Sequence, residues 1–342
     1  MKTIRIYVKI SIVITLCILK YSSNAQDLHF SQYFNSPLLV NPANTGFAPD
    51  VDWRVGINYR NQWASITPNP YKTMSVWGDL QLFNNRFENG WVGVGGSLLK
   101  DAAGSGGLTA TRGFASVAYH QLVGLNSLVS GGLNVGFVNK RIDLNKLTFD
   151  NQWNGKFFDI KFPSGEAFAT DRRTYLDLQA GLNYAIFPTD NTYINAGVSA
   201  MHLNKPTESF FTGSEYSQVV PVRYTVFLNG VFKLNDRWIV TPNTYISKMG
   251  PAMEFEIGAL ANYNLSGDGT TQLLGGLYYR AGDAFAPAIG FQLNNMKLTF
   301  SYDATTSDLG KYNATRGAYE FSIVKTGVFS QGRGIKCNMP SF

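Results

Sequence analysis

The 342-residue chain contains only two cysteines, and this scarcity excludes several classes of protein. Cys17 lies in an N-terminal segment that we expect to be removed, so Cys337 is the single cysteine of the predicted mature chain. One cysteine cannot form an intramolecular disulfide. The three histidines, His29, His120 and His202, stand apart from one another and from any cysteine at metal-ligand spacing. We therefore expect no metal and no other cofactor.

Long hydrophobic runs are missing beyond the N-terminus, which excludes helical membrane spans. The N-terminus itself has the form of a secretory signal peptide. Basic residues precede an apolar run at 10–19, and small residues precede a plausible cleavage site ahead of Gln26. The run falls short of the roughly 20 residues of a retained anchor, and Leu16 before Cys17 does not suit a lipoprotein signal. We predict that residues 1–25 are a cleaved export signal.

Charged residues are scarce, at 15% of the chain against about 25% in typical soluble proteins. The net charge of +6 comes mainly from residues 1–25, which hold four basic residues and no acidic one. Subtracting these four from 29 leaves 25 basic residues against 23 acidic ones. A balance this close to neutral, without a basic and aromatic stripe, predicts no nucleic-acid partner.

The rest of the chain shows a repeated two-residue alternation of apolar and polar side chains. Arg54 and Arg60 occupy polar positions of its clearest stretch, and Glu254 and Glu256 occupy those of a later one. Successive side chains of a β-strand face opposite sides, so each stretch predicts a strand with one apolar and one polar face. About fourteen such stretches occur, near 51–60, 72–82, 90–99, 112–122, 127–138, 173–186, 191–203, 221–234, 237–248, 251–264, 270–281, 284–293, 295–303 and 314–326.

These stretches predict an all-β fold, a transmembrane antiparallel β-barrel of about 14 strands over residues 51–326. Many reach ten or more residues, whereas soluble strands average about five or six and tilted membrane strands need about nine to eleven. In a membrane barrel the apolar face meets lipid and the polar face lines the lumen. We therefore expect Arg54, Arg60, Glu254 and Glu256 to face the lumen. With the export signal, this indicates the cell outer membrane, with its lipid as a partner.

The connections alternate between short and long, as in bacterial barrels. The longer ones lie at 61–71, 100–111, 139–172, 204–220 and 304–313. The connection at 139–172 is rich in aromatic residues, and the sequence leaves open whether it folds into the lumen or forms an outer binding surface. Aromatic residues near strand ends, among them Trp91 and Trp238, are typical of interfacial girdles.

No group of residues has the spacing of a catalytic site. His120 or His202 could serve a hydrolase of the kind that some outer-membrane barrels carry, but no spacing identifies a nucleophile or an orienting acid. The glycine-rich stretches lack the Lys-Ser/Thr of a phosphate loop. Glu254 and Glu256 are more simply interpreted as hydrated lumen side chains than as a solute site. We predict that the protein is not an enzyme.

The segment directly after the predicted cleavage site is the most specific part of the sequence. Residues 26–46 read QDLHFSQYFNSPLLVNPANTG. This resembles the mature start of the PorP/SprF family, whose members read close to QDPxFSQYxxNPLxxNPAxxG. Leu28 stands where the family often has proline, and Ser36 separates Asn35 from Pro37. The C-terminal residues KCNMPSF resemble the family ending K-C-P-x-F with two residues inserted, which leaves the role of Cys337 open.

The resemblance implies an outer-membrane component of the type IX secretion system with a barrel similar to fatty-acid transporters. Family members help to secrete or anchor particular surface proteins, such as gliding adhesins, that carry a type B C-terminal sorting domain. A peptidoglycan-linked periplasmic partner is also plausible. The alternative that the polar lumen leaves open is a porin or hydrophobic-solute transporter.

The resemblance also divides the chain into an N-terminal motif segment at 26–50, the barrel, and a C-terminal tail at 327–342. Prolines in the motif disfavour regular structure, and its aromatic residues offer apolar contacts. The segment is expected either to bind a partner or to plug the barrel. Its candidate residues are Phe30, Gln32, Tyr33, Asn35, Pro37, Asn41, Pro42 and Gly46.

Overall fold

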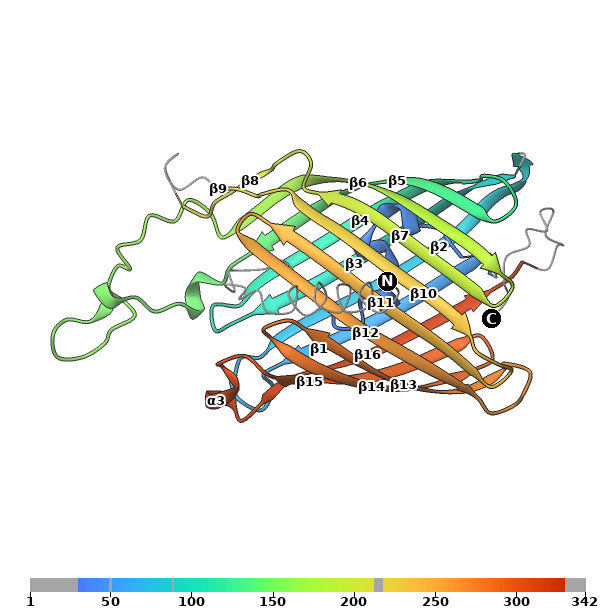
Figure 1. Ribbon diagram of the computed structural model, residues 1–342. Helices are drawn as coiled ribbons and strands as arrows, with labels where there is room; N and C mark the ends of the chain where they lie inside the picture. The colour runs from blue at the N-terminus through green and yellow to red at the C-terminus, as the bar shows by residue number, and fades with distance from the viewer. Residues whose placement is uncertain (1–29, 49–50, 88, 212–217, 330–342) are drawn as a thin grey trace, which may run out of the picture.

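The computed structural model describes residues 30–48, 51–87, 89–211 and 218–329, and within these ranges the chain folds into one closed antiparallel barrel (Figure 1). Fourteen strands follow one another around the wall, and the last strand pairs with the first. The prediction of a 14-stranded membrane barrel is confirmed. The predicted signal peptide and the end of the C-terminal tail, with Cys337, lie outside the described residues.

The strands of the barrel have the following bounds: β1 Trp53–Gln62, β2 Tyr71–Phe87, β3 Gly90–Ala103, β4 Leu108–Leu122, β5 Ser127–Arg141, β6 Arg172–Thr189, β7 Thr192–Met201, β10 Arg223–Lys233, β11 Trp238–Met249, β12 Ala252–Asn264, β13 Thr271–Arg280, β14 Ala284–Leu293, β15 Met296–Thr305 and β16 Arg316–Gly327. A separate two-stranded sheet joins β8 (Thr207–Glu208) to β9 (Gln218–Val219).

The alternation in the sequence becomes the two faces of the barrel wall. On β16, Phe321 and Ile323 point outward and are exposed, whereas Glu320 and Ser322 point inward and are buried. The exposed side chains on the outer face of the strands are mostly Val, Leu, Ile, Phe and Tyr. This is the wall of a membrane barrel, with an apolar outside and a polar inside. No helix within the described ranges is long and apolar enough to span a bilayer.

The two ends of the barrel differ in their connections. At one end, which we call the inner end, the connections span two to six residues, and the chain enters β1 and leaves β16 there. The other end, the outer end, carries the connections 63–70, 142–171, 202–222 and 306–315. Short turns face the periplasm in bacterial barrels and long loops face the exterior. The outer end therefore faces the cell exterior.

One predicted loop is wrong. Residues 100–111 belong largely to β3 and β4, which leave a connection of only four residues, 104–107. These strands have 14 and 15 residues, more than the nine to eleven that cross the membrane. They continue past the apolar band, where the lipid-facing alternation ends although the hydrogen-bonded ladder does not. The apolar alternation therefore covers fewer residues than the strands themselves.

The aromatic connection 142–171 resolves an alternative that the sequence left open. It extends away from the outer end of the barrel rather than into the lumen (Figure 1). Two short helical turns, η3 (Leu144–Lys146) and η4 (Asp150–Gln152), lie within it. We call residues 142–171 the outer aromatic loop.

Candidate functional site

The described part of the motif segment, residues 30–48, lies inside the barrel, and we call it the plug. It contains three short turns: η1 (Tyr33–Asn35), α2 (Pro37–Val40) and η2 (Pro42–Asn44). Pro37 and Pro42 each begin a turn, where a missing backbone N–H costs no hydrogen bond. The side chain of Asn41 accepts a hydrogen bond from the backbone N–H of Ala43 at 2.8 Å. These local signals make a compact segment that fits across the lumen.

Nearly every residue of the plug is buried. Leu38, Gln32 and Asn41 are each 0% exposed, although none of them belongs to the barrel wall. Many wall side chains that surround the plug are polar, and this explains how most Ser, Gln and Asn side chains of the segment keep a hydrogen bond although they are buried. The motif therefore occupies the lumen, with cavities left between it and the wall.

The start of the plug is held by charged side chains in the outer half of the lumen. The backbone N–H groups of Ser31 and Gln32 donate to the two carboxylate oxygens of Glu320, at 2.9 and 2.8 Å. The hydroxyl of Ser31 donates to Asp303 at 2.9 Å and accepts from Arg60 and Arg280, each at 2.9 Å. One serine hydroxyl thus bonds to three charged side chains, and the backbone N–H of the same residue bonds to a fourth.

Inside the lumen, the same side chains pair with one another from different strands of the wall. The guanidinium nitrogens of Arg60 and Arg280 lie 2.7 and 2.8 Å from one oxygen of Asp303, and Arg60 also lies 3.3 Å from Glu320. All four side chains are nearly fully buried. A buried carboxylate between two guanidinium groups keeps its charge because each partner balances it. We call Arg60, Arg280, Asp303 and Glu320 the ionic cluster.

Glu254 and Glu256 lie beside this cluster. Glu256 is 0% exposed and lies 3.7 Å from Arg280, while Glu254 accepts a short hydrogen bond from the hydroxyl of Tyr245. The ring of Tyr245 packs against Tyr33 of the plug, with 4.9 Å between centroids. The structure thus brings three of the four proposed lumen residues, Arg60, Glu254 and Glu256, into the outer half of the lumen.

The middle of the plug makes specific contacts with strands far away in sequence. The amide of Gln32 donates to Ser301 at 2.9 Å, and that of Asn35 donates to Thr299 at 3.0 Å. Phe34 stacks on Tyr278 at 5.2 Å between ring centroids. These contacts attach Gln32 and Asn35 to β15 and Phe34 to β13.

Asn41 and Pro42 touch the wall where the wall has glycine. The amide of Asn41 donates to the backbone carbonyls of Leu182 on β6 and Val198 on β7, at 3.0 and 3.2 Å. A Cβ atom on Gly181 would lie 1.8 Å from the side-chain oxygen of Asn41. A Cβ on Gly132 would lie 2.5 Å from the backbone of Pro42. Inward-facing glycine therefore makes the space for this part of the plug.

This close approach leads to a testable prediction. Replacing Gly181 with alanine is expected to push the plug off β6 and to lower the free energy of unfolding by about 1–3 kcal/mol, the usual cost of overpacking. Urea unfolding of the purified barrel in detergent measures it. Gly275→Ala is the matched control, because a Cβ there meets no atom within 4 Å. Equal stability of the two variants would contradict the contact.

The end of the plug turns through Gly46 and joins the wall at the inner end. Gly46 has a φ of 67°, a conformation that favours glycine, and its N–H donates to Asp79 at 2.7 Å. The indole N–H of Trp91 donates to the carbonyl of Gly46 at 3.0 Å. Arg54 donates to the carbonyl of Asn44 at 2.8 Å and to Asp79 at 3.0 Å. Arg54 thus lies at the opposite end of the lumen from Arg60.

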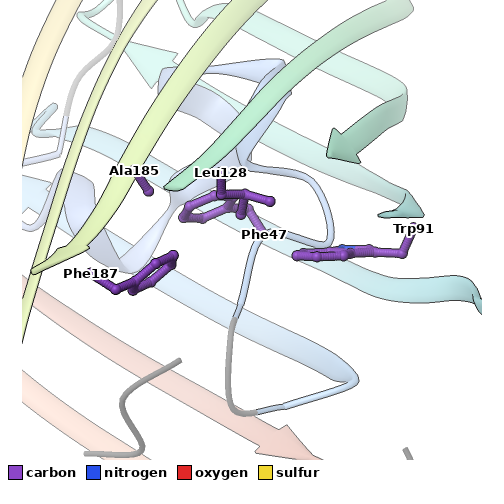
Figure 2. Close-up of a cluster of buried hydrophobic side chains, with 5 residues drawn as sticks. All are labelled: Phe47, Trp91, Leu128, Ala185 and Phe187. Carbon is purple, nitrogen blue, oxygen red and sulfur yellow. The ribbon is translucent and has the colours of Figure 1, made fainter. Parts of the chain in front are cut away.

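An apolar cluster surrounds Phe47 beside this turn, and Figure 2 shows the ring of Phe47 between strands β3, β5 and β6. The prediction that Trp91 lies in a lipid-facing interfacial girdle is wrong, because its side chain points inward and is 4% exposed. Alternation alone did not distinguish a lipid-facing tryptophan from one that meets a buried loop. The members of this cluster are Phe47, Trp91, Leu128, Ala185 and Phe187.

The two histidines that could have served catalysis are buried in the lumen. His120 bonds to Ser130 through Nδ1 at 2.7 Å and to the carbonyl of Thr45 through Nε2 at 2.8 Å. His202 lies 3.0 Å from Asp177. The Ser130–His120 pair resembles a nucleophile and a base, but its second nitrogen contacts the plug and both residues are at most 1% exposed. This geometry holds the plug rather than presenting a nucleophile.

Within the described residues, no group of three or more His, Cys, Asp or Glu side chains could bind a metal ion.

Several residues of the site were not identified from the sequence. Asp303 pairs with Arg60 and Arg280, which joins strands β15, β1 and β13, and no local sequence signal indicates this pairing. Glu320 is similar. Glycine at inward-facing positions of neighbouring strands, as at Gly132 and Gly181, is the sequence signal that could have indicated a chain segment packed closely against the inside of the wall.

Comparisons with known proteins agree with this architecture. The model of a family described as "Type IX secretion system membrane protein PorP/SprF" matches residues 22–324. No curated protein matches the sequence. Among solved structures, a FadL homologue of Pseudomonas aeruginosa has 8% identity and a TM-score of 0.50, with 84% of this chain and 92% of that chain covered. The P. putida toluene transporter TodX has 10% identity and a TM-score of 0.48, with 85% and 94% covered. At 8% identity the likeness to the FadL homologue concerns the fold alone.

Proposed function

Because the chain belongs to the PorP/SprF family of type IX secretion system membrane proteins, we propose that it helps to secrete or anchor one specific surface protein that carries a type B C-terminal sorting domain. The barrel lies in the outer membrane and acts without catalysis in this proposal. A peptidoglycan-linked periplasmic protein is a further proposed partner.

The observation that carries the proposal is the family motif folded as a plug inside the lumen. The plug occupies the lumen from Phe30 to Phe47 and so narrows any path that a solute could take. The cavity beside the plug in the outer half is about 60 Å³, far below the roughly 300–1,000 Å³ of ligand sites. The alternative of a porin or hydrophobic-solute transporter therefore has less support than a role at the outer face.

The outer aromatic loop is the surface proposed to bind the cargo domain. Its side chains Trp153, Phe157 and Phe158 are 56%, 56% and 44% exposed. Large exposed apolar patches on a protein mark interaction sites, and aromatic residues supply most of the energy at the centre of interfaces. We infer that the cargo domain covers these rings.

The loop is organised before any partner arrives. The amide of Gln152 donates to the carbonyls of Ile160 and Phe162, each at 3.2 Å. Phe168 stacks on Phe211 of the neighbouring connection, with 4.8 Å between ring centroids. Such internal contacts reduce the entropy that binding would otherwise cost.

The experiment measures binding of a purified cargo sorting domain to the purified barrel in detergent. Replacing Trp153, Phe157 and Phe158 together with serine is expected to weaken binding by more than about tenfold, because each ring is a candidate for a contribution of about 2 kcal/mol. Leu125→Ser is the matched control, since Leu125 is 85% exposed at the inner end. Absence of binding by the unchanged barrel would contradict the proposal.

A cellular test addresses the same proposal without a purified cargo. The surface proteins of the parent strain are compared with those of a strain that lacks this gene. Loss of one surface protein with a C-terminal sorting domain supports the proposal and identifies the cargo. An unchanged surface set together with reduced uptake of a solute would support the channel alternative instead.

A further inference from the structure

Four exposed cations gather on the lipid-facing side of the wall at the outer end of the barrel. The register of neighbouring strands places each of them on the same face as the exposed apolar residues. We call them the basic patch: Lys72 on β2, Lys100 on β3, Arg141 on β5 and Arg172 on β6. On β12 to β15 the outward side chains near this end are apolar or aromatic, namely Met253, Tyr279, Phe285 and Tyr302.

The basic patch consists of two like-charged pairs. Arg141 and Arg172 are directly opposite each other in the register of β5 and β6. Lys72 and Lys100 occupy diagonal positions of β2 and β3. Among the described residues, the patch makes one ion pair, in which Arg141 lies 3.8 Å from Asp171 and both side chains are more than half exposed. Such a pair is weak. Because like charges on neighbouring strand positions repel, each pair favours an anion between its members.

The basic patch lies at the level of the lipid headgroups. The first apolar residues that follow it on the outward face toward the inner end are exposed: Met74, Leu98, Phe137 and Leu176. Headgroups lie directly beyond the hydrocarbon of a bilayer, and the outer end faces the cell exterior. The anions that meet the patch are therefore headgroup phosphates of the outer leaflet, which guanidinium and ammonium groups bind well.

The two pairs stand apart, with polar side chains between them. Lys100 lies opposite Thr111 of β4, and Arg141 lies opposite Thr109, two residues further along that strand. Strand geometry then gives a backbone separation of about 12 Å between Lys100 and Arg141. The threonine hydroxyls and the amide of Asn139 occupy the row between the pairs. A disaccharide with a phosphate at each end has a comparable length and carries hydroxyl groups that these side chains can bind.

An apolar groove of about 680 Å³ lies on the same face of the wall. It is lined on β4, β5 and β6 by Val117, Leu133 and Ala180, among others. Each of these lies six residues toward the inner end from the residue that shares the ladder row of Lys100 on its strand. Six residues of a tilted strand cover about 15 Å of membrane depth. One leaflet has about 15 Å of hydrocarbon, so an acyl chain whose headgroup is on the patch reaches the groove.

We propose that this side of the barrel binds a phosphorylated glycolipid of the outer leaflet. Its two phosphates lie on the two pairs of the basic patch, its sugars lie over the polar row between them, and an acyl chain lies in the groove. The site is on the wall and does not include the outer aromatic loop. The glycolipid proposal therefore does not depend on the cargo proposal.

The test measures binding of bisphosphorylated lipid A to the full-length barrel in detergent by native mass spectrometry. Arg141→Gln with Arg172→Gln, and separately Lys72→Gln with Lys100→Gln, are each expected to weaken binding by at least about tenfold. Arg141→Lys with Arg172→Lys keeps the charge and is expected to bind nearly as well as the unchanged protein. Ala180→Phe, which fills the groove, is expected to weaken binding by a smaller factor. Heat-dependent gel mobility verifies that each variant is folded.

Arg316→Gln with Lys325→Gln is the matched control, because it removes two exposed cations from β16, outside the patch. Equal binding of lipid A without its phosphates would overturn the proposal, as would full affinity in either glutamine double variant. Full affinity in Ala180→Phe would overturn the placement of the acyl chain. Phosphatidylglycerol that binds as tightly as lipid A would show a site for any anionic lipid. Displacement of lipid A by millimolar inorganic phosphate would show a simple anion site. Either of these two results also overturns the proposal.

Discussion

Deleting residues 30–48 is expected to convert a sealed barrel into a conducting channel. The wall behind the plug is polar at Asn58, Asn183 and Ser301, so water and ions will occupy the space that the plug vacates. Closed barrels of this size enclose a channel unless side chains or a folded segment fill them. We expect single-channel conductance in planar bilayers to rise by an order of magnitude or more.

The control for this deletion removes the same number of residues from the outer aromatic loop. Deleting 148–166 also takes out 19 residues, but it leaves the plug and every strand in place. The control barrel is expected to stay sealed. The hypothesis of a plug fails if the 30–48 deletion folds, as judged by heat-dependent gel mobility, and yet conducts no more than the control. It fails equally if the unchanged protein already conducts as an open pore.

Replacing Asp303 with leucine is expected to destabilise the barrel more than the Gly181→Ala substitution does. Arg60 would lose its closest counter-charge, and Arg280 would lose a buried counter-charge, while both side chains remain buried. Removing one partner from a buried ionic group typically costs about 3–5 kcal/mol. The free energy of unfolding, measured by urea titration of tryptophan fluorescence, should fall by that amount. The plug should also loosen, since the hydroxyl of Ser31 donates to Asp303.

Two further variants test whether this loss comes from the ionic cluster. Asp308→Asn, on an exposed outer connection where Asp308 pairs with Lys311, is expected to leave stability unchanged. The double variant Arg60→Leu with Asp303→Leu should lose less than the sum of the two single losses, because contacting residues couple. Additive losses would show that Arg60 and Asp303 do not depend on each other.

The strand content of this protein could be predicted because it depends on a local property. A β-strand alternates its side chains with a period of two. Apolar residues at alternate positions, such as Phe321 and Ile323, therefore indicate the lipid-facing side of the strand without any information about the rest of the barrel. The membrane supplies the second constraint, since a lipid-exposed wall must be apolar along a fixed length. These two constraints explain why the predicted stretches and the fourteen observed strands agree.

Predictions that depended on the surroundings of a residue were less successful. Trp91 follows the rule for a girdle residue, but it donates to the carbonyl of Gly46 inside the barrel. The strands β3 and β4 continue through 100–111, where the apolar alternation fades. In both cases the sequence carries the local preference, whereas the neighbouring backbone decides the outcome.

The sequence by itself determined that this chain is a membrane barrel of the PorP/SprF type, because the alternation and the motif are both patterns of neighbouring residues. Only the tertiary structure decided that the motif fills the lumen. Ser31 meets Asp303 across 272 residues, and Asn41 meets the carbonyl of Leu182 across 141. Contacts at such separations exist only after the barrel has closed and brought its first and last strands together. No pattern of neighbouring residues contains that information.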